Sequence, residues 1–305
     1  MRYFVIVNPV SGRGLGEKSV PVIETYLHFH HIIHTLVRTE RPMHARELAA
    51  QATREGYDVI VCASGDGTIN EAINGMMRAF KEGFHCPALA ILPIGTGNDL
   101  VEGMGIQARL EERLNALTEN KRRKLDIGYI ETKGIPEGRY FANGVGIGFD
   151  AATGIKAAEV RWTRGMLAYL VGVVETIFLY YIPPKLEIVL DDEKITQFSL
   201  MVSVMNGKRM GGGFRMAPKS KPDDGVFDLC IAETASKARM FGLIPYFMRG
   251  TQEGQPEIKM RRSQKVQITA LEGTFPFHAD GELLGDDETM ARIEILPGAL
   301  EIISN

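Results

Sequence analysis

Cysteine is scarce in this sequence, and the few cysteines lie far apart. Cys62, Cys86 and Cys230 are the three cysteines among 305 residues. Disulfide-rich folds and structural zinc sites need cysteines at short, repeated spacings, so this pattern argues against both. We expect three reduced, buried thiols in a cytoplasmic protein.

The sequence also lacks a long hydrophobic run. Residues 1–7 look like a first strand and reach the polar pair Asn8-Pro9 at once, which leaves no room for the apolar region of a signal peptide. Residues 166–182 approach the length of a membrane span, but they include Glu175 and lead into a strand-like segment at 185–190. We therefore expect a helix in 166–182 that is buried or lies on a membrane surface.

An excess of charge of one sign is equally missing. The formal net charge is −3, with 24% charged and 45% hydrophobic residues. Without a general basic field, we do not expect a nucleic acid as a partner. The composition is that of an ordinary globular protein, and 305 residues exceed what one hydrophobic core usually fills, so we expect two domains.

What the sequence does contain, in its first third, is an alternation of short apolar strands with helical patterns. We expect strands at residues 3–7, 34–37, 59–62 and 88–92, and helices at residues 17–28, 45–55 and 70–81. Such alternation predicts a parallel sheet covered by helices on both faces, with ligands bound where the strands end.

From about residue 126 the pattern changes to short β-like runs. They lie at residues 139–143, 186–190, 198–205, 226–231, 266–270 and 291–296. This pattern predicts mostly antiparallel β structure, a sandwich with helical insertions. We place the first domain at residues 1–127 and the second at 128–305, with a tail of about 295–305 that returns to the first.

The strongest chemical signal is the segment 64–71, SGDGTINE, which follows a strand and opens a helix. Glycine lets the backbone approach a phosphate, and a helix N-terminus offers N–H groups and a partial positive charge. Asp66 among such groups suggests a phosphate bridged through Mg²⁺, or a proton taken from a hydroxyl. Taken alone, the segment could also be a turn in which Asp66 or Thr68 caps the helix.

Two similar turns follow other strands of the same domain. They are NPVSGRG at residues 8–14 and PIGTGND at residues 93–99. Because parallel strands end at one edge of a sheet, the three turns can surround a triphosphate with N–H and O–H donors. There is no GxxxxGK[ST] loop, and Gly12, Gly14 and Gly16 lack the GxGxxG spacing. A phosphate-loop ATPase and a nicotinamide dehydrogenase are therefore disfavoured.

Together these segments resemble the diacylglycerol kinase catalytic-domain family, which includes bacterial diacylglycerol and phosphatidylglycerol kinases and eukaryotic sphingosine and ceramide kinases. The resemblance continues through residues 211–214, 223–225 and 280–282, so it covers nearly the whole chain. Ser64 stands where bacterial members often have glycine, which leaves the substrate subclass open. The resemblance implies an α/β nucleotide-binding domain like that of NAD kinases and phosphofructokinases, followed by a β-sandwich domain for the lipid substrate.

The same resemblance implies which residues contact ATP. They lie in the three turns and just after the second strand: Asn8, Pro9, Val10, Ser11, Gly12, Thr39, Gly65, Asp66, Gly67, Thr68, Ile69, Asn70, Glu71, Thr96, Asn98 and Asp99. Thr39 rests only on its place after that strand and could be an ordinary loop residue.

In the second domain, the resemblance implies a Mg²⁺ held by Asp224 and by the carbonyls of Lys221 and Val226. The segment 222–225, PDDG, could also be a turn without metal. Glu282 is the implied proton acceptor for the lipid hydroxyl, although its neighbour Asp280, or Asp66 of the first domain, could be the base instead.

The implied activity is transfer of the γ-phosphoryl group of ATP to the hydroxyl of a lipid such as diacylglycerol, with Mg²⁺. Trp162 and Phe178, near Arg161 and Arg164, suit a membrane interface, although a buried helix explains them as well. We expect a cytoplasmic protein associated with the inner face of the membrane, and leave a homodimer open. The alternatives are a kinase for a soluble substrate, as in NAD kinases, and a catalytically silent nucleotide- or lipid-binding regulator.

Overall fold

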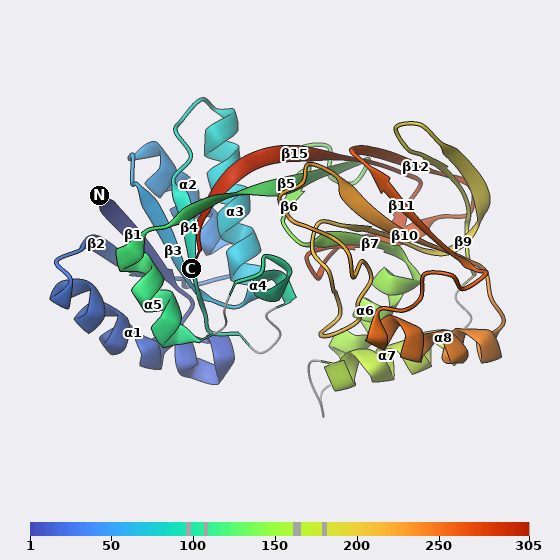
Figure 1. Cartoon of the computed structure of the whole chain (residues 1–305), viewed down its shortest axis with the longest axis horizontal. Helices are drawn as coiled ribbons and strands as arrows, with labels where there is room; N and C mark the ends of the chain where they lie inside the picture. The colour runs from blue at the N-terminus through green and yellow to red at the C-terminus, as the bar shows by residue number, and fades with distance from the viewer. Residues whose placement is uncertain (96–98, 107–108, 161–165, 179–181, 305) are drawn as a thin grey trace. The chain divides into compact units, whose positions relative to one another are not determined.

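The chain forms two compact units. The computed structural model describes residues 1–95, 99–106, 109–160, 166–178 and 182–304 (Figure 1). Unit 1 contains Met1–Leu125 and Gly298–Asn305, and unit 2 contains Asp126–Pro297. The C-terminal residues of the chain therefore belong to the same unit as its N-terminus.

Unit 1 is built on a parallel sheet. Its strands β1 (Arg2–Val7), β2 (Ile33–Arg38), β3 (Val59–Ser64) and β4 (Ala88–Pro93) lie in the order β4-β3-β1-β2 and all run in one direction. The end of β15 (Met290–Ile303) adds a parallel neighbour to β4 through Ile302 and Leu89. The predicted α/β fold is confirmed, and the segments that follow β1, β3 and β4 leave the sheet at one edge.

Helices cover both faces of this sheet (Figure 1). Helices α1 (Ser11–Phe29) and α5 (Leu110–Glu119) bury Ile23 and Leu117 against one face. Helices α2 (His44–Arg54) and α3 (Asp66–Lys81) pack on each other over the opposite face. Gly75 makes this close approach possible, because a Cβ there would lie 2.1 Å from the carbonyl oxygen of Arg46. The short helix α4 (Asp99–Gly103) follows β4.

A fully buried arginine ties the last strand of the chain to β4. Arg113 on α5 donates from Nε to the Ile91 carbonyl oxygen at 3.0 Å and from Nη2 to the Ile303 carbonyl oxygen at 2.6 Å. Burial lowers the pKa of Arg113 to about 10, so the guanidinium is still charged at neutral pH. The contact fixes the strand from which the third glycine-rich turn departs.

All three cysteines are free thiols, as predicted. Cys62 and Cys230 are buried, whereas Cys86 is only half-buried. Burial raises the pKa of each thiol to about 12, so all three are protonated at neutral pH.

Unit 2 is a mostly antiparallel β structure. Its strands are β6 (Arg139–Phe141), β7 (Gly144–Gly148), β8 (Lys185–Val189), β9 (Lys194–Met205), β10 (Phe227–Glu233), β11 (Ile258–Ser263), β12 (Lys265–Glu272), β13 (Phe275–Ala279) and β14 (Glu282–Glu288), together with parts of β5 (Arg122–Thr132) and β15. The predicted antiparallel sandwich is confirmed.

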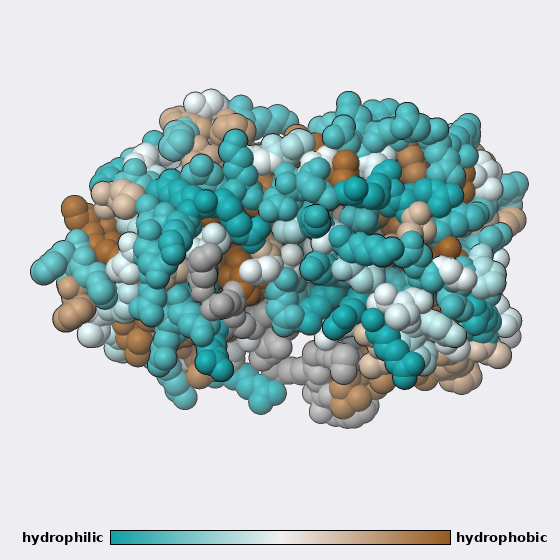
Figure 2. Space-filling model, viewed as in Figure 1, coloured by the Kyte–Doolittle hydropathy of each residue, from teal (hydrophilic) through white to brown (hydrophobic). Residues whose placement is uncertain are grey.

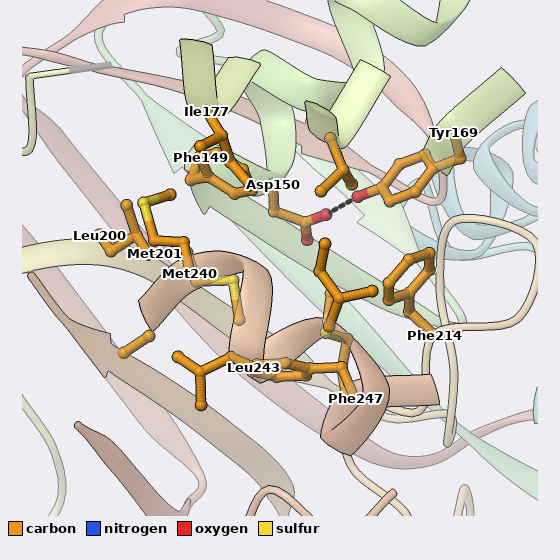
Figure 3. A pocket seen from close by; sticks show the side chains of 14 residues that line it. Phe149, Asp150, Tyr169, Ile177, Leu200, Met201, Phe214, Met240, Leu243 and Phe247 are labelled. Atoms are coloured by element: carbon orange, nitrogen blue, oxygen red, sulfur yellow. Dashed lines mark hydrogen bonds between the residues drawn. The ribbon is translucent and has the colours of Figure 1, made fainter. Parts of the chain in front are cut away.

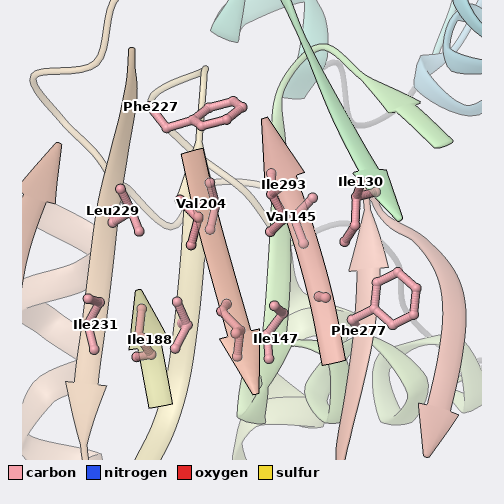
Figure 4. Close-up of a cluster of buried hydrophobic side chains, with 14 of the residues drawn as sticks. Ile130, Val145, Ile147, Ile188, Val204, Phe227, Leu229, Ile231, Phe277 and Ile293 are labelled. Atoms are coloured by element: carbon pink, nitrogen blue, oxygen red, sulfur yellow. The ribbon is translucent and has the colours of Figure 1, made fainter. Parts of the chain in front are cut away.

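One long strand, β9, joins the two sheets of unit 2. Its first half pairs with β8, and its second half pairs with β7 and β10, where Val204 lies opposite Val145 and Leu229. Ile188, Val204 and Phe277 fill the space between the sheets as a buried apolar core (Figure 4).

Three helices of unit 2 enclose a second apolar cluster. They are α6 (Phe149–Glu159), α7 (Met166–Phe178) and α8 (Lys237–Arg249), and their apolar side chains meet those of β9 and β10. The helix expected in residues 166–182 is α7. Among the residues that the structure describes, no helix is both long enough and apolar enough to span a bilayer.

Candidate functional site

The first glycine-rich turn departs from regular helix immediately after β1. Gly12, Arg13 and Gly14 have left-handed φ angles of 57°, 62° and 86°, which interrupt α1 after its first residue. Glycine adopts such angles without steric penalty. When residues with right-handed and left-handed backbone angles follow one another, their N–H groups point into one concave surface, which suits an anion.

Hydrogen bonds connect the first turn to the second. Asn8 donates from Nδ2 to Oγ1 of Thr68 at 2.9 Å, and the Gly65 N–H donates to Oγ of Ser11 at 3.3 Å. Thr39 lies beside the first turn, because its N–H donates to the Val7 carbonyl oxygen at 2.8 Å. The predicted nucleotide residues of these segments are thus brought together.

The third turn contacts both of the others. The Ile94 N–H donates to the Ser64 carbonyl oxygen at 2.9 Å, and a Cβ on Gly12 would lie 2.7 Å from the Ile94 carbonyl oxygen. The Asp99 N–H donates to Oδ2 of Asp66 at 2.9 Å. Thr96 and Asn98, also predicted to contact ATP, lie outside the described residues.

The second turn is itself the start of helix α3. Gly65 is the N-cap in an extended conformation, and as a glycine it has no side chain to cap the first N–H groups of the helix. Neither Asp66 nor Thr68 therefore acts as the N-cap, which was the alternative explanation of the sequence. Uncapped N–H groups at a helix start attract an anion. Asp66, in the first turn of the helix, adds a carboxylate of the kind that binds Mg²⁺ beside a phosphate.

Not every predicted nucleotide residue turns toward this edge. Ile69 and Asn70 are almost completely buried in α3. Glu71 accepts the Ala45 N–H on Oε2 at 3.3 Å, so its carboxylate lies at the start of α2. Val10 has a side chain that is 77% exposed. We therefore assign no phosphate contact to the side chains of these four residues.

In unit 2, Asp280 holds a turn together. Its Oδ1 accepts the N–H groups of Asn143 and Gly144, both at 2.9 Å, and its Oδ2 accepts that of Ala142 at 2.8 Å. Its own N–H donates to the Gly144 carbonyl oxygen at 2.9 Å, and its φ is 48°. The carboxylate thus fastens the β13–β14 turn to the segment between β6 and β7.

Glu282, the first residue of β14, is differently placed. Its carboxylate pairs with the guanidinium of Arg139. The Glu282 side chain is 41% exposed, whereas that of Arg139 is 8% exposed. A buried cation therefore holds an accessible carboxylate in position, and this arrangement suits a group that meets a substrate hydroxyl.

The turn that leads into β10 carries the predicted metal ligands Lys221, Asp224 and Val226. Asp224 pairs with the guanidinium of Arg262. The Gly225 N–H donates to Oδ2 of Asp126 at 2.7 Å. Among the described residues, no group of three His, Cys, Asp or Glu side chains could hold a metal ion.

Unit 2 also contains an apolar pocket that the sequence did not indicate (Figure 3). It has about 530 Å³ of empty space, part of it open to solvent. Its walls come from α7, α8 and β9, through side chains such as Val173, Leu200, Leu243 and Phe247. The apolar lining suits a hydrocarbon chain.

A buried carboxylate, Asp150, lies in the wall of this pocket. It accepts a hydrogen bond from the Tyr169 hydroxyl, and its Oδ2 lies 3.5 Å from Nε2 of His278 and from Oγ of Ser203. Burial alone raises the pKa of Asp150, but the hydrogen bonds and the charge of His278 outweigh it, so the pKa lies below its ordinary value. The carboxylate is therefore an anion in an otherwise apolar wall. In the sequence, this buried carboxylate was marked only by the position of Asp150 between a strand and an apolar helix.

Two protein families match the chain over consecutive segments. Residues 2–130 match the diacylglycerol kinase catalytic domain. Residues 143–304 match the YegS C-terminal NAD kinase beta sandwich-like domain. Between them, the two matches include all three glycine-rich turns, the pocket, Asp280 and Glu282.

Curated relatives and solved structures agree with these matches. The chain is 27% identical over 292 residues to a diacylglycerol kinase of Staphylococcus saprophyticus, covering 92% of this chain and 88% of the relative, and 28% identical over 296 residues to one of Bacillus subtilis, covering 92% and 89%. Its fold is similar to a crystal structure of a diacylglycerol kinase from Bacillus anthracis, with a TM-score of 0.75, 21% identity and coverage of 100% and 97%. It is also similar to yeast NADH kinase complexed with NADH, with a TM-score of 0.56, 10% identity and coverage of 100% and 84%. At these identities the two structures support the fold alone.

Proposed function

We propose that this protein transfers the γ-phosphoryl group of ATP to the hydroxyl of a lipid such as diacylglycerol. The chain belongs to the diacylglycerol kinase catalytic-domain family and is a kinase on that ground. Unit 1 binds the nucleotide, and unit 2 binds the acceptor. The observation that carries the lipid acceptor is the apolar pocket of unit 2, with the single buried carboxylate of Asp150 in its wall.

The three turns of unit 1 supply the donors for the phosphates. We assign ATP contacts to the N–H groups of Gly67 and Thr68 at the start of α3, and to the first turn from Asn8 to Gly12. ATP would bring its own Mg²⁺, and we assign Asp66 to hold that metal, which would neutralise phosphate charge. Charge neutralisation and positioning are the main demands of phosphoryl transfer, and this donor set provides both.

On the acceptor side, we assign the proton acceptor to Glu282. Its carboxylate is accessible, and Arg139 holds it in place. Asp280 is assigned a positioning role instead, because its carboxylate accepts three backbone N–H groups. The apolar walls of the pocket take an acyl chain.

A membrane-facing surface on α7 and α8 would give access to such a lipid. Leu167 and Phe178 on α7 are 52% and 61% exposed, and Met248 on α8 is 38% exposed. Lys237 lies next to Phe178, with Nζ 5.9 Å from the centre of the Phe178 ring. Figure 2 shows exposed hydrophobic residues in this part of unit 2. Apolar side chains beside a cation suit an anionic membrane surface. Trp162, Arg161 and Arg164 lie outside the described residues.

Sedimentation with vesicles tests this surface. We expect Phe178→Ser and Leu167→Ser to lower co-sedimentation with vesicles that contain anionic lipid. Phe29→Ser is the control, because Phe29 is 77% exposed at the end of α1 in unit 1. Equal losses in all three variants would remove the assignment of membrane contact to α7.

A labelled-phosphate screen tests the reaction itself. Purified protein is given γ-labelled ATP with diacylglycerol, phosphatidylglycerol, a sphingoid base, ceramide or undecaprenol, and NAD serves as the soluble acceptor. We expect label in diacylglycerol. Label in NAD instead would establish a soluble-substrate kinase, and label in no acceptor would favour a silent regulator.

A further inference from the structure

Two acidic side chains at the start of β10 share one arginine. Asp224 lies in the turn that precedes the strand, and Asp228 lies on the strand itself. Arg262 on β11 is the direct cross-strand partner of Asp228. Its Nη2 donates to Oδ2 of Asp224, and its Nε lies 3.7 Å from Oδ1 of Asp228. The pairing of β10 with β11 therefore delivers a cation to both carboxylates.

Other protein groups hold the same turn from its remaining sides. The Gly225 N–H donates to Oδ2 of Asp126 at 2.7 Å, and the Gly225 carbonyl oxygen accepts from Nε2 of Gln264 at 3.1 Å. The Asp126 N–H donates to the Pro222 carbonyl oxygen at 2.8 Å. The shape of the turn is thus set by hydrogen bonds within the protein.

A divalent cation fits this turn poorly. Mg²⁺ needs about six oxygen ligands in a near-octahedral arrangement. The turn offers Asp224 and the carbonyls of Lys221 and Val226, but Asp224 already has a guanidinium on Oδ2. A doubly charged ion next to that group would be repelled by it. A second carboxylate, that of Asp228, also lies beside the same guanidinium, with Oδ1 3.7 Å from Nε of Arg262.

We propose that Arg262 is the resident cation of this turn and takes the place of the Mg²⁺ that the family resemblance assigns to Lys221, Asp224 and Val226. The turn then folds in the absence of divalent metal. Without Arg262, the carboxylates of Asp224 and Asp228 would lack their shared cation, and together with the carbonyl oxygens of Lys221 and Val226 they would bind a divalent cation. The inference does not depend on the lipid acceptor or on catalysis.

The test uses the full-length protein without nucleotide, so that no Mg²⁺ arrives with ATP. Melting temperatures are measured in EDTA and in MgCl₂ at matched ionic strength, and Mn²⁺ binding is followed by electron paramagnetic resonance. The variants are Arg262→Met, Asp224→Asn and the double variant. Arg261→Met is the control, because the neighbouring Arg261 pairs with Glu193, away from the turn. The Arg262 side chain is 56% exposed, so methionine can be accommodated there.

The wild type should melt at the same temperature in EDTA and in Mg²⁺ and should bind no Mn²⁺. Arg262→Met should melt at least about 2 °C lower in EDTA and recover in Mg²⁺. Arg262→Met should also bind one Mn²⁺. In the double variant, the added Asp224→Asn change should abolish both the recovery in Mg²⁺ and the binding of Mn²⁺. Arg261→Met should not respond to metal.

Two results would overturn the proposal. One is a wild type that binds a divalent ion and loses it in Asp224→Asn. The other is an Arg262→Met protein that folds but has no metal response. If Arg262→Met does not fold, the comparison of metal binding between the wild type and Asp224→Asn still tests the proposal. Loss of kinase activity would not affect these measurements, so they remain separate from the proposed function.

Discussion

The sharpest structural prediction concerns Asp280→Asn. Asparagine tolerates the left-handed backbone of this position, where φ is 48°, so the substitution changes the side chain alone. It keeps one oxygen for the N–H groups of Asn143 and Gly144, but it turns an NH₂ group toward the N–H of Ala142. One charge-assisted hydrogen bond is lost, and two are weakened.

The expected loss of stability follows from these three bonds. A hydrogen bond to a charged group contributes roughly 1.5–3 kcal/mol, and a buried N–H left without an acceptor costs about 1–3 kcal/mol. We expect Asp280→Asn to lower the free energy of unfolding by about 3 kcal/mol in total, a fall of roughly 6–12 °C in Tm for a unit of this size. Differential scanning calorimetry measures it.

Glu282→Gln is the matched control, two residues away. Glu282 is 41% exposed, and glutamine keeps a side-chain oxygen that can accept the hydrogen bond of Arg139, so water and this oxygen offset the lost charge. We therefore expect a small thermal shift and a large loss of phosphoryl transfer for Glu282→Gln. If Asp280→Asn melts like the wild type while transfer is lost, the positioning role of Asp280 is wrong and its carboxylate takes part in the chemistry.

Three further predictions concern the turns and the pocket. In a fluorescent-nucleotide titration, Gly12→Ala should weaken ATP binding about tenfold more than Gly14→Ala. Both glycines have a left-handed φ, but only at Gly12 would a Cβ meet the Ile94 carbonyl oxygen. Equal losses of affinity in the two variants would contradict this prediction. Asp150→Asn should lower the free energy of unfolding at pH 7, and this loss should shrink as the pH falls below about 4, because the lowered pKa of Asp150 stabilises the fold above the unfolded pKa and the contribution disappears as pH falls through the lower folded pKa. Urea unfolding from pH 7 down through this range checks it, and a loss independent of pH would refute it. Ile244→Trp narrows the pocket and should raise KM for diacylglycerol roughly tenfold with KM for ATP unchanged, whereas an equal rise in both would contradict the acceptor assignment.

The sequence was most informative where apolar strands end in polar turns. β1, β3 and β4 lie within two residues of their predicted bounds, because each is a short apolar run closed by glycine, proline or asparagine. The meeting of the three turns followed from parallel topology. Helix α3 begins at Asp66 and not at residue 70, since glycine and aspartate have low helix propensity and concealed its first turn.

Other features depend on contacts that no local pattern contains. Helix α8 includes Gly242 and Pro245, which interrupt a helical pattern, and it is stabilised by burial of Leu243 and Phe247. The surroundings of Asp150 come from residues far along the chain, such as His278. The cross-strand position of Arg262 depends on the register of β10 and β11. Pairing of this kind is set by tertiary structure, so it could not be predicted from the sequence.

The central claim is that the γ-phosphoryl group of ATP passes to a lipid hydroxyl, with the nucleotide held by the turns of unit 1. The most direct measurement is the rate at which γ-labelled ATP places label in diacylglycerol vesicles, for the wild type and Asp66→Asn. Asparagine keeps an oxygen for the Asp99 N–H, so the contact between the second and third turns survives in the variant. We expect label in the lipid with the wild type, and a loss of at least about 100-fold with Asp66→Asn at an unchanged melting temperature. A folded Asp66→Asn protein that labels diacylglycerol at the wild-type rate, or a wild type that leaves the lipid unlabelled, would contradict the account.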